Sequence, residues 1–254
     1  MSQWMIYGAN GYTGTLLAQA AAARGLKPVL AGRNTRAITQ LGESLGLPHQ
    51  CFDLHDQQAL QQTLAEHRVI LNCAGPFSAT SQPLIDACLA TGCHYLDITG
   101  EIDAFVAAQA RQTDAEQANI VICPGVGFDV IPTDCIAARL KQELPDADRL
   151  ALGFDSRSAL SPGTAKTSVE GLKYGGRIRK DDRIVSVPLA YQSRDIDFGN
   201  GTKHAVTIPW GDIATAWFST GIDHIEVFLP MAPSAATRLR RLDRLRPLLG
   251  LPPV

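Results

Sequence analysis

A glycine-rich segment near the N-terminus constrains the fold more than any other stretch of this sequence. Gly8, Gly11 and Gly14 follow an apolar run over residues 4–7 and precede a Leu/Ala-rich run over 12–24. A glycine turn between a strand and a helix lets backbone N–H groups approach a phosphate, and the helix N-terminus adds partial positive charge. The spacing departs from the usual G-x-G-x-x-G, so an ordinary strand-to-helix turn is the alternative interpretation. The setting between strand and helix favours a seat for the pyrophosphate of a dinucleotide.

Arg33 indicates which dinucleotide this is. It follows the second predicted strand (27–31), where an Asp or Glu usually holds the ribose 2′-hydroxyl of NAD and an Arg suits a 2′-phosphate. No acidic residue precedes Glu43, so we expect no charge near the site that repels the extra phosphate. A solvated loop arginine is the alternative. The sequence therefore predicts NADP as the cofactor, with NAD less favoured.

Strand-like and helix-like patterns alternate six times over residues 1–149. The predicted strands cover 4–7, 27–31, 49–54, 69–74, 94–99 and 119–123. The predicted helices cover 12–24, 35–45, 57–67, a segment capped by Ser81 that ends at Gly92, a long segment from 101 through 118, and 132–144. This alternation predicts an α/β fold: a Rossmann-type doubly wound parallel sheet with right-handed crossovers.

The pattern changes in residues 150–254. Strand-like runs over 150–154, 183–191, 205–208 and 224–229 recur with only short helices between them. They predict a second, mixed α/β domain that contains an antiparallel sheet. The arginine-rich segment over 238–246 is interpreted as a half-buried helix with a solvated face, and a membrane-surface helix is the alternative.

Composition excludes several classes of partner. A net charge of −2 over 254 residues gives no global field for nucleic acid or for an anionic membrane. No apolar run approaches the ~18 residues that span a bilayer, and the N-terminus lacks the features of a secretory signal, so we expect no transmembrane segment and a cytoplasmic location. The six cysteines form no Cys-x-x-Cys pair, which favours reduced, buried thiols and no metal site.

Seven short motifs spread over nearly the whole chain carry a family resemblance. They are GANGYTG (8–14), AGR (31–33), NCAGPF (72–77), HYLDITGE (94–101), PGVGFD (124–129), PWGD (209–212) and STG (219–221). With these motifs the sequence resembles the saccharopine dehydrogenase-like oxidoreductases, in particular the branch of trans-acting enoyl reductases. Members of this family typically continue beyond the length seen here, so a natural short form and an absent C-terminal portion both stay open at Val254.

The resemblance implies a Rossmann cofactor domain, an appended substrate domain and a nicotinamide-linked redox activity on a small-molecule or acyl substrate of unspecified identity. Hydride transfer also needs a group that handles a proton, and in an open α/β sheet such groups lie beyond the carboxyl ends of the strands. The catalytic candidates there are Tyr95, Asp97 and Glu101. The predicted cofactor-binding residues are Gly8, Asn10, Gly11, Tyr12, Thr13, Gly14, Arg33, Cys73, Ala74, Gly75, Pro76 and Phe77.

Each catalytic candidate has a structural alternative. Asp97 and Glu101 equally suit hydrogen bonds to their loop or capping of the following helix, and Tyr95 suits the core. Asp129 and Asp134 are interpreted as caps of the helix after Pro132.

Two further expectations concern the second domain. Lys166 is a candidate for contact with an acidic or acyl-thioester substrate, against the commoner solvated lysine, and we expect a homodimer through this domain. The alternative to an enzymatic function is a protein that binds NADP(H) without turnover and reports redox state to a partner.

Overall fold

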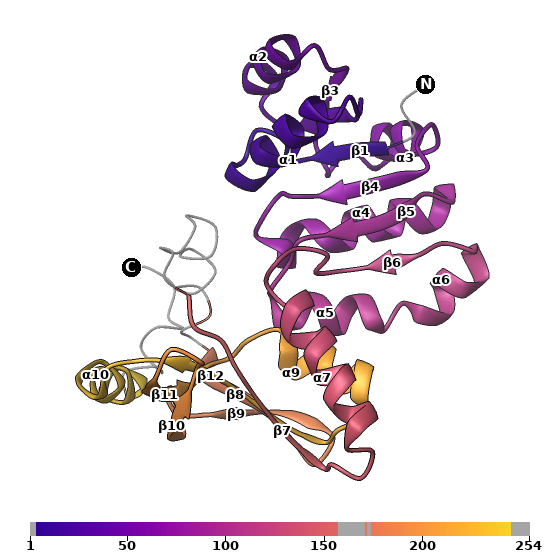
Figure 1. Cartoon of the computed structure of the whole chain (residues 1–254). Coiled ribbons are helices and arrows are strands. Elements are labelled where there is room, and N and C mark those ends of the chain that lie inside the picture. The colour runs from indigo at the N-terminus through magenta and orange to yellow at the C-terminus, as the bar shows by residue number, and fades with distance from the viewer. Residues whose placement is uncertain (1–3, 157–170, 172–173, 245–254) are drawn as a thin grey trace. The chain divides into compact units, whose positions relative to one another are not determined.

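The computed structural model describes residues 4–156, 171 and 174–244, and divides into two units, residues 1–129 and 130–254 (Figure 1). The division falls before helix α7 (Ile131–Glu143), whereas the sequence placed the domain boundary after this helix, at 149/150. Helix α7 therefore belongs with the second unit, where it packs on α9 (Asp212–Thr220).

A six-stranded parallel sheet forms the centre of the first unit, with strand order β3-β2-β1-β4-β5-β6. Its strands are β1 (Trp4–Tyr7), β2 (Val29–Gly32), β3 (His49–Cys51), β4 (Val69–Asn72), β5 (His94–Asp97) and β6 (Ile122–Cys123). The chain leaves β1 toward β2 and β3 on one side and returns to β4 on the other. This is the doubly wound Rossmann order, which confirms the predicted fold class and puts its switch point between β1 and β4.

Helices cover both faces of this sheet. One face packs on α1 (Tyr12–Ala23) and α2 (Thr35–Leu45), around Ile6, Leu30 and Ile38. The other packs on α3 (Gln57–Leu64), α4 (Phe77–Thr91), α5 (Ile102–Gln109) and α6 (Gln112–Ala118), around Met5, Ile70 and Tyr95. Alternate residues of β1 and β2 therefore enter opposite cores, as expected for strands that are buried on both sides.

Two helix predictions in the first unit were wrong. The helix predicted to begin after Ser81 begins at Phe77, so Ser81 is a buried residue within α4 and Pro83 lies inside the helix. The single long helix predicted through Ala118 is two helices, α5 and α6, with a break at Ala110 and Arg111. In the second case the sequence pattern stayed helical across the true boundary, and in the first the cap chemistry of Ser81 placed the start too late.

The second unit contains a six-stranded mixed sheet. Its strands are β7 (Arg149–Gly153), β8 (Gly176–Lys180), β9 (Arg183–Val187), β10 (Ser193–Asp197), β11 (Thr202–Thr207) and β12 (His224–Pro230). All pairs are antiparallel except β7 with β12, which confirms the predicted second sheet. The sequence analysis missed β8 and β10.

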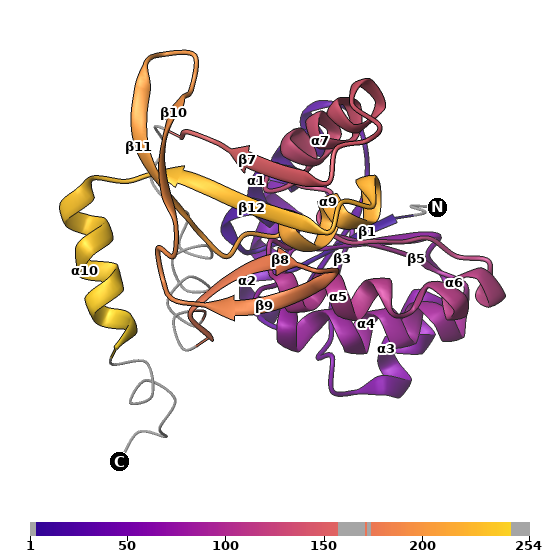
Figure 2. The same cartoon turned by 90° about the horizontal axis from the view of Figure 1, so that it is seen from below.

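Helix α10 (Pro233–Asp243) packs beside the β10–β11 hairpin (Figure 2). Ala236 is fully buried against Val206 and Ala190, while the arginines of the helix lie on its outer side or reach the backbone, as Arg240 does at Ala190. The predicted half-buried helix is thus present up to Asp243.

The structure bears on the expected burial of the thiols and on the expected absence of a membrane-spanning helix. All six thiols are free, but only Cys88 and Cys93 are buried, and Cys123 and Cys135 are exposed, so the expectation of buried thiols holds for two of them. Within residues 4–156 and 174–244, no helix is long and apolar enough to cross a membrane.

Candidate functional site

The glycine turn predicted from the sequence forms a tightly packed corner between β1 and α1. The backbone N–H of Gly8 donates a hydrogen bond of 2.8 Å to the carbonyl of Ala31, and Gly8 has a φ of +76°, which favours glycine. A Cβ on Gly8 would lie 2.7 Å from the amide nitrogen of Ala74, and a Cβ on Gly14 would lie 2.3 Å from the carbonyl oxygen of Gly8. Both glycines are therefore required by close backbone packing.

The N-terminus of α1 lies at this corner, and no side chain caps the backbone N–H groups of its first turn. Gly11 is the N-cap, it makes no side-chain cap, and the first turn contains no acidic residue. The first N–H groups of a helix have no partner inside the helix, and together with the helix dipole they attract an anion. Tyr12 is exposed and Thr13 is half-buried there. The corner thus has the backbone donors and the open approach that a pyrophosphate needs.

Arg33 and Asn10 lie at the carboxyl end of β2. Both are exposed, and Oδ1 of Asn10 lies 3.0 Å from where a Cβ on Gly32 would be. Arg33 has no ion-pair partner among the residues that the structure describes. An acidic residue beyond Glu43, Asp53, was not considered in the prediction for Arg33. After burial, Asp53 is the next cause that raises the pKa of Tyr7, and Arg33 lowers this pKa.

The loop after β4 lies against the glycine corner. The N–H of Cys73 donates to the carbonyl of Tyr7 at 2.8 Å, and the N–H of Ala74 donates to Oδ1 of Asn72 at 3.0 Å. Burial, and to a smaller extent the carboxylate of Asp97, raises the pKa of Cys73 to about 12, so this thiol stays protonated. Of the predicted cofactor-binding residues of this loop (73–77), Cys73 and Ala74 thus lie beside Gly8 and Gly11 of the first loop.

A buried hydrogen-bond network joins β4, β5 and the loop after β6. The hydroxyl of Tyr95 donates to Oδ2 of Asp97 at 2.7 Å and accepts a bond of 3.2 Å from Nδ2 of Asn72. The other carboxylate oxygen, Oδ1, accepts bonds from the N–H groups of Thr99 and Gly125, at 3.0 and 2.7 Å. Tyr95 is 0% exposed and Asp97 is 1% exposed. Every carboxylate oxygen of Asp97 is thus occupied by a protein donor.

Burial raises the pKa of Asp97 above its ordinary value, although the backbone donors at Thr99 and Gly125 oppose this shift. Burial and the neighbouring Asp97 raise the pKa of the Tyr95 hydroxyl well above its ordinary range. The tyrosine therefore remains a proton donor to the aspartate at neutral pH. Of the two structural alternatives considered for Asp97, the structure shows the hydrogen bonds to its loop.

Glu101 caps a helix, but not the one that follows it. Its two carboxylate oxygens accept hydrogen bonds of 2.8 Å from the N–H groups of Phe77 and Ser78, at the start of α4. Its own N–H donates to the hydroxyl oxygen of Thr99 at 3.0 Å. Glu101 thus ties the loop after β5 to the loop after β4. Direct participation of Tyr95, Asp97 or Glu101 in a reaction stays a prediction.

The predicted caps of the helix after Pro132 are not formed. Helix α7 has Val130 as its N-cap and no side-chain cap. Asp134 instead accepts a hydrogen bond of 2.7 Å from the hydroxyl of Ser219. Asp129 occupies the space beside Gly100, whose Cβ would lie within 1.8 Å of Oδ2, and burial raises its pKa to about 6. Both aspartates therefore make tertiary contacts.

Tyr7, the last residue of β1, is a candidate that the sequence analysis did not single out. Its side chain is 2% exposed, its ring lies 5.2 Å from that of Phe52, and its hydroxyl has no hydrogen-bond partner among the described residues. Burial raises its pKa to about 12, with Asp53 contributing. The only sequence signal was a polar hydroxyl in an otherwise apolar strand, directly before the first glycine.

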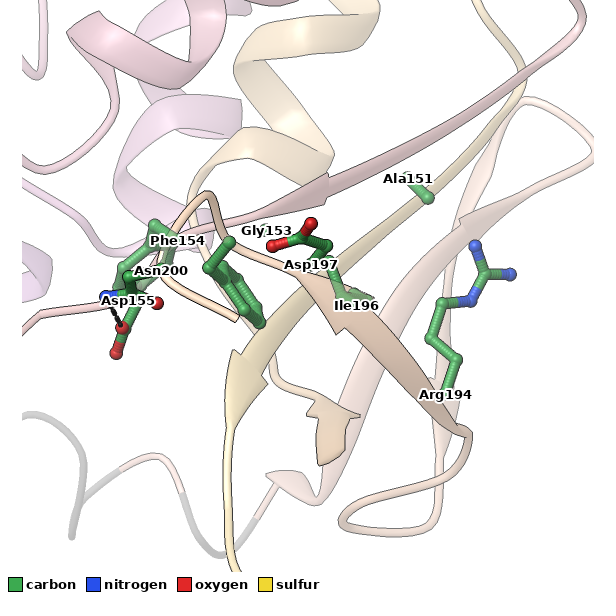
Figure 3. A pocket seen from close by; sticks show the side chains of 9 residues that line it. Ala151, Gly153, Phe154, Asp155, Arg194, Ile196, Asp197 and Asn200 are labelled. Carbon is green, nitrogen blue, oxygen red and sulfur yellow. Dashed lines mark hydrogen bonds between the residues drawn. The ribbon is translucent and has the colours of Figure 1, made fainter. Parts of the chain in front are cut away.

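The second unit has a pocket of its own, with a volume of about 560 Å³ (Figure 3). Arg194 stands at one end, with its guanidinium 4.8 Å from the centre of the Phe228 ring, and Asp155 and Asn200 stand at the other. Asp155 pairs with Lys203 at 2.5 Å. Lys166, the predicted substrate contact, lies outside the described residues. Within the described residues, no cluster of three or more His, Cys, Asp or Glu side chains has the arrangement of a metal site.

Comparisons with known proteins agree with this geometry. The family model described as the saccharopine dehydrogenase NADP binding domain matches residues 4–123. A mitochondrial saccharopine dehydrogenase-like oxidoreductase of Arabidopsis thaliana is 30% identical over 200 residues, which cover 69% of this chain and 44% of that protein. A trans-acting enoyl reductase of Mycobacterium ulcerans is 27% identical over 203 residues, 72% of this chain and 48% of that protein. The chain thus spans about half the length of the curated relatives that it matches.

The structure of apo saccharopine dehydrogenase (L-Glu forming) from Saccharomyces cerevisiae has a similar fold. Its TM-score is 0.67 at 14% identity, and the match covers 98% of this chain and 59% of that one. At this identity the likeness is evidence for the fold alone. It extends over both units, so the second sheet as well as the Rossmann unit has a counterpart among solved structures.

Proposed function

Residues 4–123 belong to the saccharopine dehydrogenase NADP-binding domain family, and from this premise we propose that the chain is an NADP-dependent oxidoreductase. It transfers a hydride to or from a small or acyl substrate, in the manner of an enoyl reductase. The names of the curated relatives support this reaction class. The observation that carries the proposal is the corner of Gly8, Gly11 and Gly14 at the switch point of the sheet, where doubly wound folds bind dinucleotides.

The residues at this corner fit NADP. Unpaired N–H groups at the start of α1 suit the pyrophosphate, and the absence of a Cβ at Gly11 leaves the backbone approachable. The exposed guanidinium of Arg33 suits a 2′-phosphate, because Arg binds phosphate through a planar pair of donors. Asp53 lies in the same region and favours a donor group such as an amine or a hydroxyl rather than a second phosphate.

Bound NADPH supplies the hydride. The protein holds the loops at the carboxyl ends of β4, β5 and β6 in fixed positions around it, through the carboxylates of Asp97 and Glu101. Each of their oxygens accepts at least one hydrogen bond from a protein donor, and Tyr95 is fully buried. This geometry supports positioning roles for all three residues, instead of direct contact with the reacting atoms.

Turnover with defined substrates tests the proposal. Purified protein is mixed with NADPH and, separately, with an enoyl thioester, an imine and a keto acid, and the absorbance of the cofactor is followed. We expect tight NADPH binding and oxidation in the presence of the enoyl thioester. Tight binding with no oxidation by any compound would favour the redox sensor, and no binding would contradict both functions.

A homodimer through the second unit is a further part of this proposal. Size-exclusion chromatography with light-scattering detection measures the mass of the protein in solution. A mass of twice 27.3 kDa would support a homodimer. A monomer at all concentrations would contradict it.

A further inference from the structure

Two tyrosines of the parallel sheet are buried to the same degree but differ in what their hydroxyl groups contact. Tyr95 is 0% exposed, and its hydroxyl bonds to Asp97 and Asn72. Tyr7 is 2% exposed, and its hydroxyl has no partner among the described residues. A buried hydroxyl without a hydrogen bond destabilises the folded protein, so its retention calls for an explanation outside the unliganded fold.

The position of Tyr7 identifies the part of the cofactor site that it faces. It ends β1, one residue before Gly8, and its ring contacts Phe52 after β3. The charges that act on its hydroxyl come from Arg33 after β2 and from Asp53 after β3. In this fold the ribose and adenine bind beyond the ends of these strands, whereas the nicotinamide lies on the side of β4 and β5. Tyr7 therefore belongs to the adenosine side.

Two exposed side chains carry the charges that act on the hydroxyl. Arg33 and Asp53 are both exposed, and neither is held by an ion pair within the described part of the chain. Among the described residues, the carboxylate of Asp53 accepts a hydrogen bond of 2.9 Å from the N–H of His55. A ligand that reaches the hydroxyl has to displace these two exposed side chains.

We propose that the hydroxyl of Tyr7 is a binding contact for the adenosine half of the cofactor, made directly or through one enclosed water molecule. This inference rests on the proposed function, since it presupposes NADP at this corner. Besides the glycines and Arg33, the proposed site then includes Tyr7, whose side chain lies on the face of the sheet that α3 and α4 cover. A water-mediated bond is nearly as favourable as a direct one, so both forms give the same measurable dependence on the hydroxyl.

Tyr7→Phe tests the inference, because it removes the hydroxyl and keeps the ring against Phe52. Binding of adenosine 2′,5′-bisphosphate and of NADPH is measured by calorimetry, and the melting temperature of the free protein is measured in parallel. We expect binding of both ligands to weaken by about fivefold, the size of one neutral hydrogen bond. The melting temperature of the free variant should stay the same or rise, since an unsatisfied polar atom is removed.

Tyr95→Phe is the matched control. Its hydroxyl has two partners, so this variant should melt at a lower temperature than the wild type and retain most of its affinity for adenosine 2′,5′-bisphosphate. Unchanged ligand binding by Tyr7→Phe, with normal binding by the wild type, would overturn the inference alone. Absence of NADPH binding by the wild type would overturn the proposed function as well.

A second measurement does not depend on a variant. In protein labelled with ¹³C-tyrosine, we expect the ring resonances of Tyr7 to shift on titration with adenosine 2′,5′-bisphosphate and to stay in place with nicotinamide mononucleotide. Equal shifts with the two halves, or none with the first, would overturn the assignment to the adenosine side.

Discussion

Glu101 caps the helix that begins at Phe77: its Oε1 accepts a hydrogen bond of 2.8 Å from the backbone N–H of Phe77. The two residues lie 24 positions apart, in the loops after β5 and β4. A side chain from one loop thus supplies the cap that the other loop lacks, since the local N-cap, Pro76, contributes no side-chain bond.

Removal of this cap should lower stability. We expect Glu101→Ala to lower the free energy of unfolding by about 1–2 kcal/mol, the usual loss for a capping side chain, as measured by urea denaturation. Glu43→Ala, at an exposed position of α2, is the control and should change it by less than about 0.5 kcal/mol. A fully stable Glu101→Ala protein that loses turnover would instead indicate direct participation of Glu101 in the reaction.

Arg33 should determine the choice between the two nicotinamide cofactors. We expect Arg33→Ala to weaken NADPH binding by at least about tenfold and to leave NADH binding nearly unchanged, because only NADPH carries the 2′-phosphate. Fluorescence titration of both cofactors measures this. Arg24→Ala, at the other end of α1, is the control for loss of positive charge. Equal losses for NADPH and NADH at position 33 would show that Arg33 does not contact the 2′-phosphate.

Gly11 and Gly14 should respond differently to the same substitution. A Cβ at Gly14 would lie 2.3 Å from the carbonyl oxygen of Gly8 and 2.8 Å from Cα of Ala9, so Gly14→Ala should destabilise the first unit strongly. Gly11 has a φ of −74° and its Cβ would lie 3.2 Å from the same oxygen. We expect Gly11→Ala to fold and to lose NADPH affinity, as shown by circular dichroism and calorimetry. Normal cofactor binding by Gly11→Ala would mean that the pyrophosphate does not lie there.

Asp129 should make stability depend on pH. Burial raises its folded-state pKa to about 6, so protonation favours the folded protein, and this contribution is lost as pH rises from about 4 through 6. Relative to Asp129→Asn, the wild type should therefore lose at most about 3 kcal/mol of unfolding free energy across this range. Urea denaturation at intervals of pH measures the difference. A difference that is constant from pH 4 to 7 would contradict the raised pKa.

The sequence predicted those parts of the first unit whose signals are local. Asn34 and Asp56 cap α2 and α3 through hydrogen bonds to residues three positions ahead, and Gly46 and Gly92 end helices in the left-handed conformation. Such contacts depend only on neighbouring residues, so the pattern is enough to place them. The alternation of these elements was then sufficient to predict a doubly wound parallel sheet, while the strand order came from the structure.

Features that depend on distant residues were missed. Ser81 has the chemistry of an N-cap, but α4 begins earlier because Glu101 satisfies its first N–H groups from another loop. The strands β8 and β10 carry arginines and aspartates in place of an apolar alternation, so their sequences resemble loops. The unpaired hydroxyl of Tyr7 becomes visible only when the contacts around it are known.

The parallel pairing of β7 with β12 determines when the second sheet can be completed during synthesis on the ribosome. His224 aligns with Arg149 and Phe228 with Gly153, so β7, the first strand of the second sheet in the sequence, has no partner until β12, the last, has been synthesised. All strands of the first sheet have already left the ribosome by then, and domains tend to fold in order as they emerge. A truncation before residue 224 should thus leave a Rossmann unit with all its strands joined to a second sheet that lacks its central strand.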